Sequence, residues 1–182
     1  MHLLQAFCCH KKKKGNYAYT RSAQATRRFD GTVTKKEHIF YGNNTIGFIG
    51  LGLIGGSIDK AIRKFHPEYQ ILAYNRTRDT LEDAVFDGIV DIACDEQDSK
   101  FALCDIIFLC ATVDYNIECL PWLKQIIRPG CILTDVGSVK GEIHKEITAL
   151  SMAPNFIGGH PMAGSEKTGY EHSTDHLIEN AY

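Results

Sequence analysis

Short apolar runs alternate with helix-like segments from Thr45 onward. Nearly unbroken apolar runs of this kind are typical of strands that are covered on both faces, as in a parallel sheet. The pattern predicts strands at 45–49, 71–74, 89–93, 105–111, 131–134 and 155–158. Because helical segments separate these strands, we expect an α/β domain with a doubly wound, mostly parallel sheet.

Helical spacing of apolar residues predicts the intervening helices. The helix after the first strand places one apolar row on a single face: Ile54, Ile58, Ala61, Ile62 and Phe65. On another face of this helix, Asp59 can pair with Arg63 one turn later. Thr80 is a candidate cap for the second helix. Two more helices are predicted at 116–127, where Pro121 marks a start or a kink, and at 139–150.

Composition indicates one soluble domain. With 182 residues, 44% of them hydrophobic and 23% charged, the chain can bury one sizeable core. No run approaches the roughly 18 apolar residues of a membrane-spanning helix, so we expect no membrane association. The seven cysteines form no CxxC pair, which favours a reducing cytoplasm. Cys8, Cys9 and His10 lack the usual ligand spacing, so no metal site is expected.

Charge separates the first 44 residues from the rest. Residues 1–44 carry nine Lys/Arg against two Asp/Glu, a net +7, whereas residues 45–182 carry eleven against twenty, a net −9. The basic run at 11–14 has no apolar periodicity and no aromatic–basic motif, so we expect a flexible extension and no nucleic-acid partner. The folded, dinucleotide-binding domain is predicted at 45–182.

A GxGxxG fingerprint joins the first strand to the first helix. Gly50 permits the tight turn, Gly52 lets the backbone approach a pyrophosphate, and Gly55 allows close packing of helix and strand. Free N–H groups at the helix start, including those of Leu53 and Ile54, are predicted to hold the negative charge. Because the motif sits between a strand and a helix, it predicts a Rossmann-like, NAD- or NADP-binding domain.

The second strand ends in Asn75-Arg76-Thr77-Arg78. An NAD-binding domain normally has an acidic residue here, which hydrogen-bonds the adenosine ribose. Without that carboxylate a 2′-phosphate is not repelled, and the two arginines can bind it, so the segment slightly favours NADP over NAD. The alternative is that both arginines are simply solvated. Asn75, Arg76 and Thr77 are therefore candidate cofactor-binding residues.

Two further motifs carry a family resemblance. Residues 135–140 read DVGSVK and residues 158–170 read GGHPMAGSEKTGY. Together with GFIGLGLIGGS at 47–57, they closely resemble the prephenate dehydrogenase family, in the same order and at similar spacing. The resemblance covers residues 45–182 and implies an oxidoreductase of tyrosine biosynthesis.

The resemblance also implies roles for single residues. His160 corresponds to the catalytic histidine, which draws off the proton of the substrate's ring hydroxyl as hydride leaves. Ser138 corresponds to a residue that helps hold this hydroxyl and the histidine, and Glu166 to an acidic residue near the entrance. A histidine suits the role, since its unperturbed pKa of about 6.5 lets the neutral imidazole accept a proton near neutral pH.

The implied reaction is NAD(P)-dependent oxidative decarboxylation of prephenate to 4-hydroxyphenylpyruvate. Arogenate is the nearest alternative substrate, because it differs from prephenate only at the side chain. The sequence does not identify the residues that would bind this side chain. A β-hydroxyacid dehydrogenase or an imine reductase shares the nucleotide-binding fold but not the HPMAGSEK segment. A nucleotide-sensing module without catalysis is the non-enzymatic alternative.

The resemblance sets one more expectation, at the end of the chain. Family members continue past an ENAY segment, here residues 179–182, into another strand and a helical domain. That domain supplies much of a homodimer interface and basic residues for the substrate carboxylates. We therefore expect this chain to bind the dinucleotide but to catalyse poorly by itself.

Overall fold

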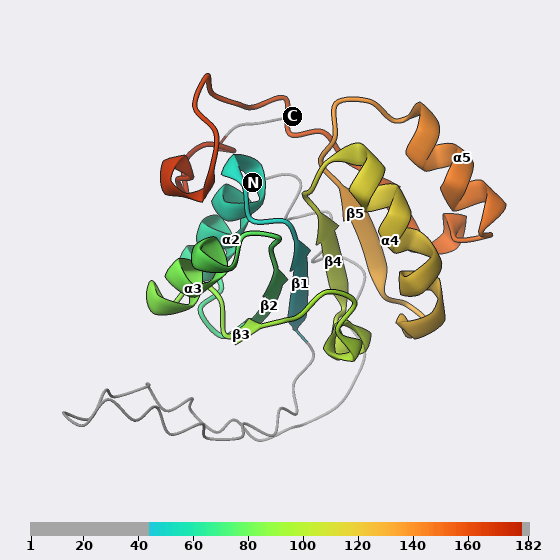
Figure 1. Ribbon diagram of the computed structural model, residues 1–182, viewed down its shortest axis with the longest axis horizontal. Helices are drawn as coiled ribbons and strands as arrows, with labels where there is room; N and C mark the ends of the chain where they lie inside the picture. Colours follow the sequence, from blue (N-terminus) through green and yellow to red (C-terminus); the bar gives the residue numbers. More distant parts are fainter. Residues whose placement is uncertain (1–43, 180–182) are drawn as a thin grey trace.

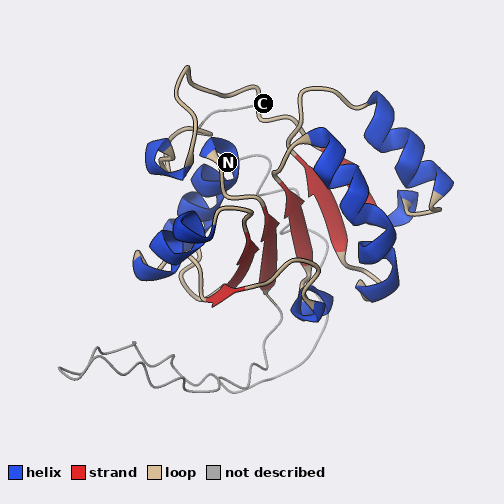
Figure 2. Ribbon diagram, in the orientation of Figure 1, coloured by secondary structure: helices blue, strands red, loops and turns tan. Residues whose placement is uncertain are grey.

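The computed structural model describes residues 44–179, so the predictions made for residues 1–43 lie outside it. The described residues form one six-stranded sheet with helices on both faces (Figures 1 and 2). Its strands are β1 (Thr45–Ile49), β2 (Gln70–Tyr74), β3 (Ile92–Ala93), β4 (Ile106–Leu109), β5 (Ile132–Asp135) and β6 (Phe156–Gly158). All neighbouring strands pair in parallel, in the order β3-β2-β1-β4-β5-β6. The predicted doubly wound parallel sheet is confirmed.

Two pairs of helices cover the two faces of the sheet (Figure 1). The helices are α2 (Leu53–Phe65), α3 (Arg78–Phe86), α4 (Val113–Ile126) and α5 (Gly141–Ala149). The apolar sides of α2 and α3 pack on one face of the sheet, and those of α4 and α5 on the other. Phe48 of β1 and Phe108 of β4 stack on the α2 side with ring centroids 5.1 Å apart. Each strand of the sheet centre is therefore covered on both sides, as its apolar sequence predicts.

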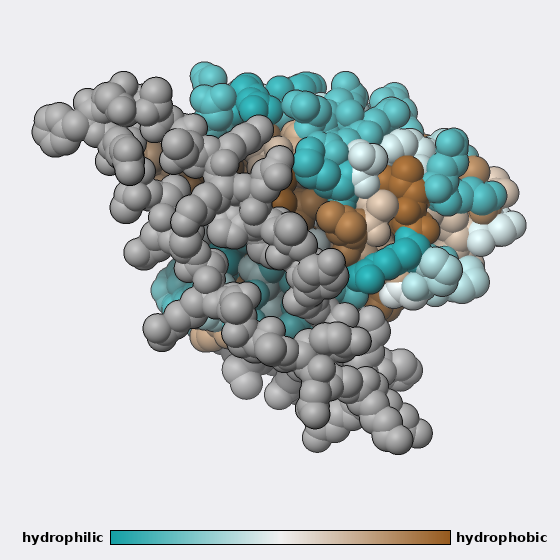
Figure 3. All heavy atoms as spheres, turned by 90° about the horizontal axis from the view of Figure 1, so that it is seen from below, coloured by the Kyte–Doolittle hydropathy of each residue, from teal (hydrophilic) through white to brown (hydrophobic). Residues whose placement is uncertain are grey.

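Residues 44–179 also contain three short 3₁₀ helices: η1 (Ser99–Leu103), η2 (Ala153–Asn155) and η3 (Tyr170–His172). No helix among residues 44–179 is long and apolar enough to cross a membrane. Figure 3 views the molecule from the amino edge of the sheet and shows apolar surface among hydrophilic areas. The exposed apolar side chains include Phe65 and Phe86, the last residues of α2 and α3.

Several predicted boundaries were wrong. Helix α3 begins at Arg78 with Thr77 as its N-cap residue, so Thr80 lies inside the first turns and does not cap them. Helix α4 begins at Val113 and contains Pro121 in its interior. Strand β3 is shorter than predicted, with only Ile92–Ala93 paired to β2. Local sequence signals place such ends less well than they place the elements themselves, because tertiary packing decides the last residues.

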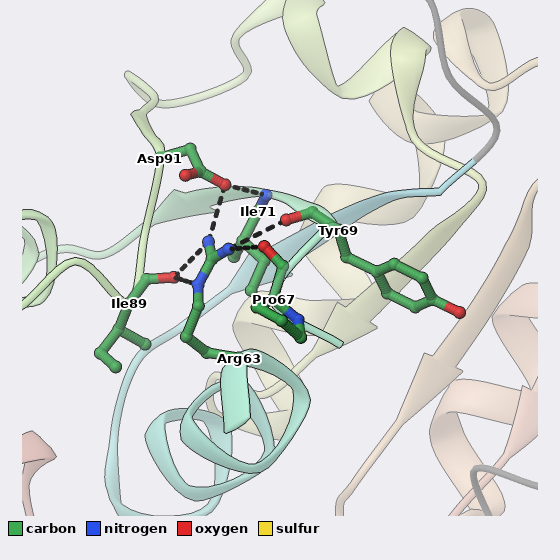
Figure 4. Close-up of polar contacts among 6 residues, drawn as sticks. All are labelled: Arg63, Pro67, Tyr69, Ile71, Ile89 and Asp91. Carbon is green, nitrogen blue, oxygen red and sulfur yellow. Dashed lines mark hydrogen bonds and ion pairs between the residues drawn. The ribbon is translucent and has the colours of Figure 1, made fainter. Parts of the chain in front are cut away.

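The predicted pair between Asp59 and Arg63 is also wrong, and Figure 4 shows what Arg63 does instead. Its guanidinium donates to the carbonyl oxygens of Pro67 (3.1 Å), Tyr69 (3.1 Å) and Ile89 (2.9 and 3.2 Å) and to the Asp91 carboxylate (2.7 Å). These bonds use all five N–H groups of an arginine. Arg63 therefore ties the end of α2 to the segments before β2 and β3.

Asp59 has no such partner. Its side chain is fully buried, and neither carboxylate oxygen has a hydrogen-bond partner among residues 44–179. Burial raises the pKa of Asp59 well above its usual range, and the nearby charge of Arg63 only partly offsets this. The fold thus contains a buried acid that prefers its neutral form.

Candidate active site

The predicted site residues gather at one edge of the sheet. Parallel strands all end on the same side, and ligands of open α/β sheets bind at that carboxyl edge, where the strand order reverses. Here the reversal lies between β1 and β4, which are neighbours in the sheet. The fingerprint loop follows β1, the Asn75 segment follows β2, and the motifs with Ser138 and His160 follow β5 and β6. The carboxyl edge is the upper edge in Figure 1.

The three fingerprint glycines have different surroundings. Gly50 has φ +98°, and a Cβ there would lie 2.7 Å from the backbone nitrogen of Ala111. A Cβ on Gly55 would collide with the Gly50 carbonyl oxygen and approach the Cys110 Cβ to 2.9 Å. A Cβ on Gly52 would meet nothing within 4 Å. The loop is therefore pressed against the end of β4 on one side and open at Gly52, as close approach of a pyrophosphate requires.

The N-terminus of α2 is free of protein caps. Gly52 is the N-cap residue, no side chain of the described residues caps the helix, and its first turn contains no acidic residue. The first N–H groups of a helix, here those of Leu53, Ile54 and Gly55, have no partner within the helix, and they carry its positive partial charge. This end of α2 fits the phosphates of a dinucleotide.

Asn75 holds the fingerprint loop in place. Its Oδ1 accepts a hydrogen bond from the N–H of Leu51 (2.9 Å), and its Nδ2 donates to the carbonyl oxygen of Thr77 (3.1 Å). These bonds join the end of β2 to the loop after β1. Asn75 therefore contributes to loop geometry, in addition to any contact that it makes with a ribose.

The two arginines after β2 differ. Arg78 lies within reach of Glu82 (3.3 Å) and Asp95 (3.5 Å), so carboxylates already surround its guanidinium. Arg76 is exposed and makes no hydrogen bond or ion pair within residues 44–179. Of the two, Arg76 is the one without a charged partner among residues 44–179.

A buried carboxylate joins the two motif loops. Asp135 is 1% exposed, and its carboxylate accepts hydrogen bonds from the Lys140 ammonium (2.5 Å) and the Gly137 N–H (3.1 Å). The Gly159 N–H, next to His160, donates to the backbone oxygen of Asp135 at 3.1 Å. Sequence reasoning found no role for Lys140 and did not single out Asp135. The contact with Gly159 depends on the adjacency of β5 and β6, which sequence spacing does not reveal.

The predicted catalytic residues lie on these loops but are not bonded to one another. Ser138 is exposed and His160 is half-buried. Within residues 44–179 neither the hydroxyl nor the imidazole makes a hydrogen bond with another residue. Glu166 is exposed and has no ion pair among the described residues. The structure brings the loops of Ser138 and His160 to neighbouring strand ends and leaves both groups accessible to a ligand.

Comparisons with known proteins point to one family. The family described as prephenate dehydrogenase, nucleotide-binding domain, matches residues 58–182. A prephenate dehydrogenase of Lactococcus lactis subsp. cremoris is 37% identical over 142 residues, which cover 74% of this chain and 38% of the relative.

Solved structures agree with this match. A prephenate dehydrogenase from A. aeolicus, in complex with hydroxyphenyl propionate and NAD+, superposes with a TM-score of 0.70 at 30% identity, covering 78% of this chain and 49% of that one. An arogenate dehydrogenase from Synechocystis gives a TM-score of 0.68 at 35% identity, covering 75% of this chain and 48% of that one. The chain thus spans less than half the length of these relatives.

Proposed function

Because the chain belongs to the prephenate dehydrogenase family, we propose that it is the nucleotide-binding part of an enzyme that converts prephenate to 4-hydroxyphenylpyruvate. The observation that carries this proposal is the meeting of two loops at the carboxyl edge. One is the open fingerprint loop at Gly52, and the other is the His160 loop tied to the end of β5. A cofactor on the first loop and a substrate at the second lie along the same edge.

In the proposed reaction, the neutral imidazole of His160 accepts the proton of the ring hydroxyl while hydride leaves the carbon that bears it. The bound nicotinamide supplies the hydride acceptor. The carbon thereby becomes a carbonyl carbon, the ring carboxylate departs as carbon dioxide, and the bonding electrons make the ring aromatic. His160 returns its proton to the resulting phenolate oxygen, so no net proton is released. Ser138 holds the substrate hydroxyl during the transfer. Glu166 lies near the entrance of the proposed active site and modulates its activity.

For the cofactor, we propose a slight preference for NADP over NAD. Asn75 replaces the usual acid after β2, and its amide oxygen is engaged by the Leu51 N–H. Arg76 is accessible there and carries the positive charge that a 2′-phosphate requires. The NAD+ complex of the A. aeolicus relative supports nicotinamide cofactors in general.

We propose that this chain alone binds a dinucleotide but turns over prephenate poorly. Prephenate carries two carboxylates, which bidentate arginines recognise best. Of the arginines in residues 44–179, Arg63 and Arg128 are engaged by carbonyl and carboxylate oxygens away from the site, and Arg76 and Arg78 follow β2. A further helical domain, as the resemblance implies, is the proposed source of the missing cations and of a homodimer interface.

We propose that the protein works in a reducing cytoplasm on a small-molecule substrate. We propose no nucleic-acid or membrane partner. Cys94 and Cys119 are free and buried, and burial raises the pKa of the Cys94 thiol to about 12 and that of Cys119 to about 11. Such thiols remain reduced and unreactive in a reducing compartment.

One experiment tests the proposed function. Calorimetry measures the affinity of the 182-residue chain for NAD and NADP, and absorbance of the reduced cofactor measures turnover with prephenate, arogenate and a panel of hydroxyacids. We expect dinucleotide binding, with any turnover confined to prephenate or arogenate. Faster turnover of arogenate would favour the alternative substrate, and turnover of a hydroxyacid alone would refute the proposal. Full activity with prephenate would show that no second domain is needed.

A further inference from the structure

Helix α2 carries two residues that the fingerprint does not require. Gly56 and Ser57 follow Gly55 directly, and both are buried. A Cβ on Gly56 would lie 2.8 Å from the Tyr170 ring and 2.8 Å from the Ser173 hydroxyl. The segment 170–175, here called the anchor segment, is therefore packed so closely on α2 that only glycine fits.

Polar contacts hold the anchor segment on α2. The Thr174 N–H donates to the Ser57 hydroxyl (3.0 Å), which itself donates to the carbonyl oxygen of Leu53 (2.7 Å). The Lys60 ammonium donates to the carbonyl oxygen of Ser173 (3.0 Å). The bonds from Thr174 to Ser57 and from Lys60 to Ser173 join residues more than 110 positions apart in sequence. They fix the anchor segment to the helix whose N-terminus faces the proposed pyrophosphate.

Tyr170 is the centre of this contact. Its side chain is 5% exposed, and the Lys60 ammonium lies 4.2 Å from its ring centroid. The Tyr170 hydroxyl donates to the Asp87 carboxylate (3.3 Å), just beyond α3. An aromatic ring that is buried beneath an ammonium group and hydrogen-bonded at its tip has one defined position.

The His160 loop is thus held at both ends. Gly159, at its start, is bonded to Asp135 at the end of β5, and Tyr170, at its end, is packed on α2. Between these points residues 164–168 are exposed. The loop crosses from the β6 edge to the α2 side of the sheet (Figure 1).

We propose that Tyr170, together with Gly56, Ser57 and Lys60 of α2, forms a set of positioning residues that fixes the His160 loop relative to the cofactor-binding helix. This rests on the proposed function, in which His160 acts at the substrate and the α2 N-terminus holds the cofactor. One helix then sets both the position of the cofactor and that of the loop that carries the base. A small displacement of such a loop is costly, because proton and hydride transfer both need defined distances.

Amide hydrogen exchange on the 182-residue chain tests the anchor. In Gly56→Ala the added methyl group collides with the Tyr170 ring, and we expect exchange of the Thr174 amide to rise about tenfold or more. Ser57→Ala removes one neutral hydrogen bond, so a rise of roughly two- to tenfold is expected there. Gly141→Ala is the matched control, since a Cβ at this helix start meets nothing within 4 Å. Unchanged exchange in both anchor variants would overturn the proposal.

Two further readouts separate positioning from simple stability. Tyr170→Leu should shift the ring resonances of His160 in an NMR spectrum, and Tyr170→Phe, which keeps the ring on Lys60, should restore them. In a form of the enzyme that turns over, prephenate turnover should fall roughly ten- to a hundredfold in Tyr170→Leu at unchanged cofactor affinity, and Tyr170→Phe should recover it. Unshifted His160 resonances would refute the positioning role. A form extended by the helical domain that binds the dinucleotide but does not turn over prephenate would instead count against the proposed function, while exchange and the His160 resonances still decide the anchor.

Discussion

Replacing Asp59 by its neutral isostere should stabilise the protein at neutral and alkaline pH. Asp59 lies fully buried in α2, and neither of its oxygens accepts a hydrogen bond from the described part of the chain. The guanidinium of Arg63, one turn away, has all five N–H groups bonded elsewhere. An ionised Asp59 would therefore be a buried charge without a direct partner, and Asp59→Asn removes that charge with little change of shape.

The sign and size of the effect follow from the raised pKa. Because burial raises the pKa of Asp59 in the folded state, the fold prefers the protonated carboxyl. Its stabilising contribution is fully present below the unfolded pKa of about 3.9 and is lost as pH rises through the folded pKa. Between these two values, wild-type stability falls by about 1.4 kcal/mol per pH unit on account of this group, whereas Asp59→Asn has no such dependence.

Urea unfolding of both proteins from pH 4 to pH 9 measures this difference. We expect the variant to be no more stable than wild type near pH 4 and to gain on it steadily as pH rises toward the folded-state pKa of Asp59. Glu142→Gln is the control, because Glu142 is exposed on α5 in a pair with Lys145. Parallel stability curves for wild type and Asp59→Asn would show that the carboxylate is ionised and solvated in the fold, and would refute the reasoning.

Three further predictions concern the site. In a form of the enzyme that turns over, His160→Asn should lower turnover by about 10²-fold or more at nearly unchanged cofactor affinity, and near-normal turnover would remove His160 from the mechanism. Arg76→Ala should weaken NADP binding but not NAD binding in calorimetry, and equal losses for both cofactors would contradict this. Arg78→Ala should have less effect, because the Arg78 guanidinium already lies near the carboxylates of Glu82 and Asp95. Lys140→Met removes the cation beside the buried carboxylate at the end of β5 and should cost about 1–3 kcal/mol in urea unfolding, since its ammonium is partly exposed. Lys145→Met, at an exposed lysine, should lower the free energy of unfolding by less than about 0.5 kcal/mol. An equal loss in both variants would refute the role of Lys140 as the partner of the buried carboxylate.

The fold could be predicted from the sequence because the central strands are buried on both faces. All five residues of β1 are buried, so its apolar run carries a clear signal. The errors arose where distant residues compete with local ones. Asp59 and Arg63 have the spacing of a helical ion pair, but carbonyl oxygens near β2 and β3 engage the guanidinium. Thr80 resembles a cap, but α3 has already begun at Arg78.

For the candidate site, sequence motifs located the loops but not the contacts between them. The fingerprint and the motifs with Ser138 and His160 all lie at the carboxyl edge, as the strand order requires. The bond from Gly159 to Asp135 and the packing of Tyr170 on Gly56 join residues 24 and 114 positions apart. No periodicity records such contacts, because they depend on which strands and helices become neighbours.

The strand order separates the cofactor end of the proposed active site from its substrate end. Arg76 follows β2 and His160 follows β6, and these strands are separated by β1, β4 and β5. At about 4.8 Å per strand, the two loops begin roughly 19 Å apart. Substitutions this far apart usually combine additively. Under the proposed function, coenzyme preference at the end of β2 and reactivity at the end of β6 are therefore two separate engineering problems on one scaffold.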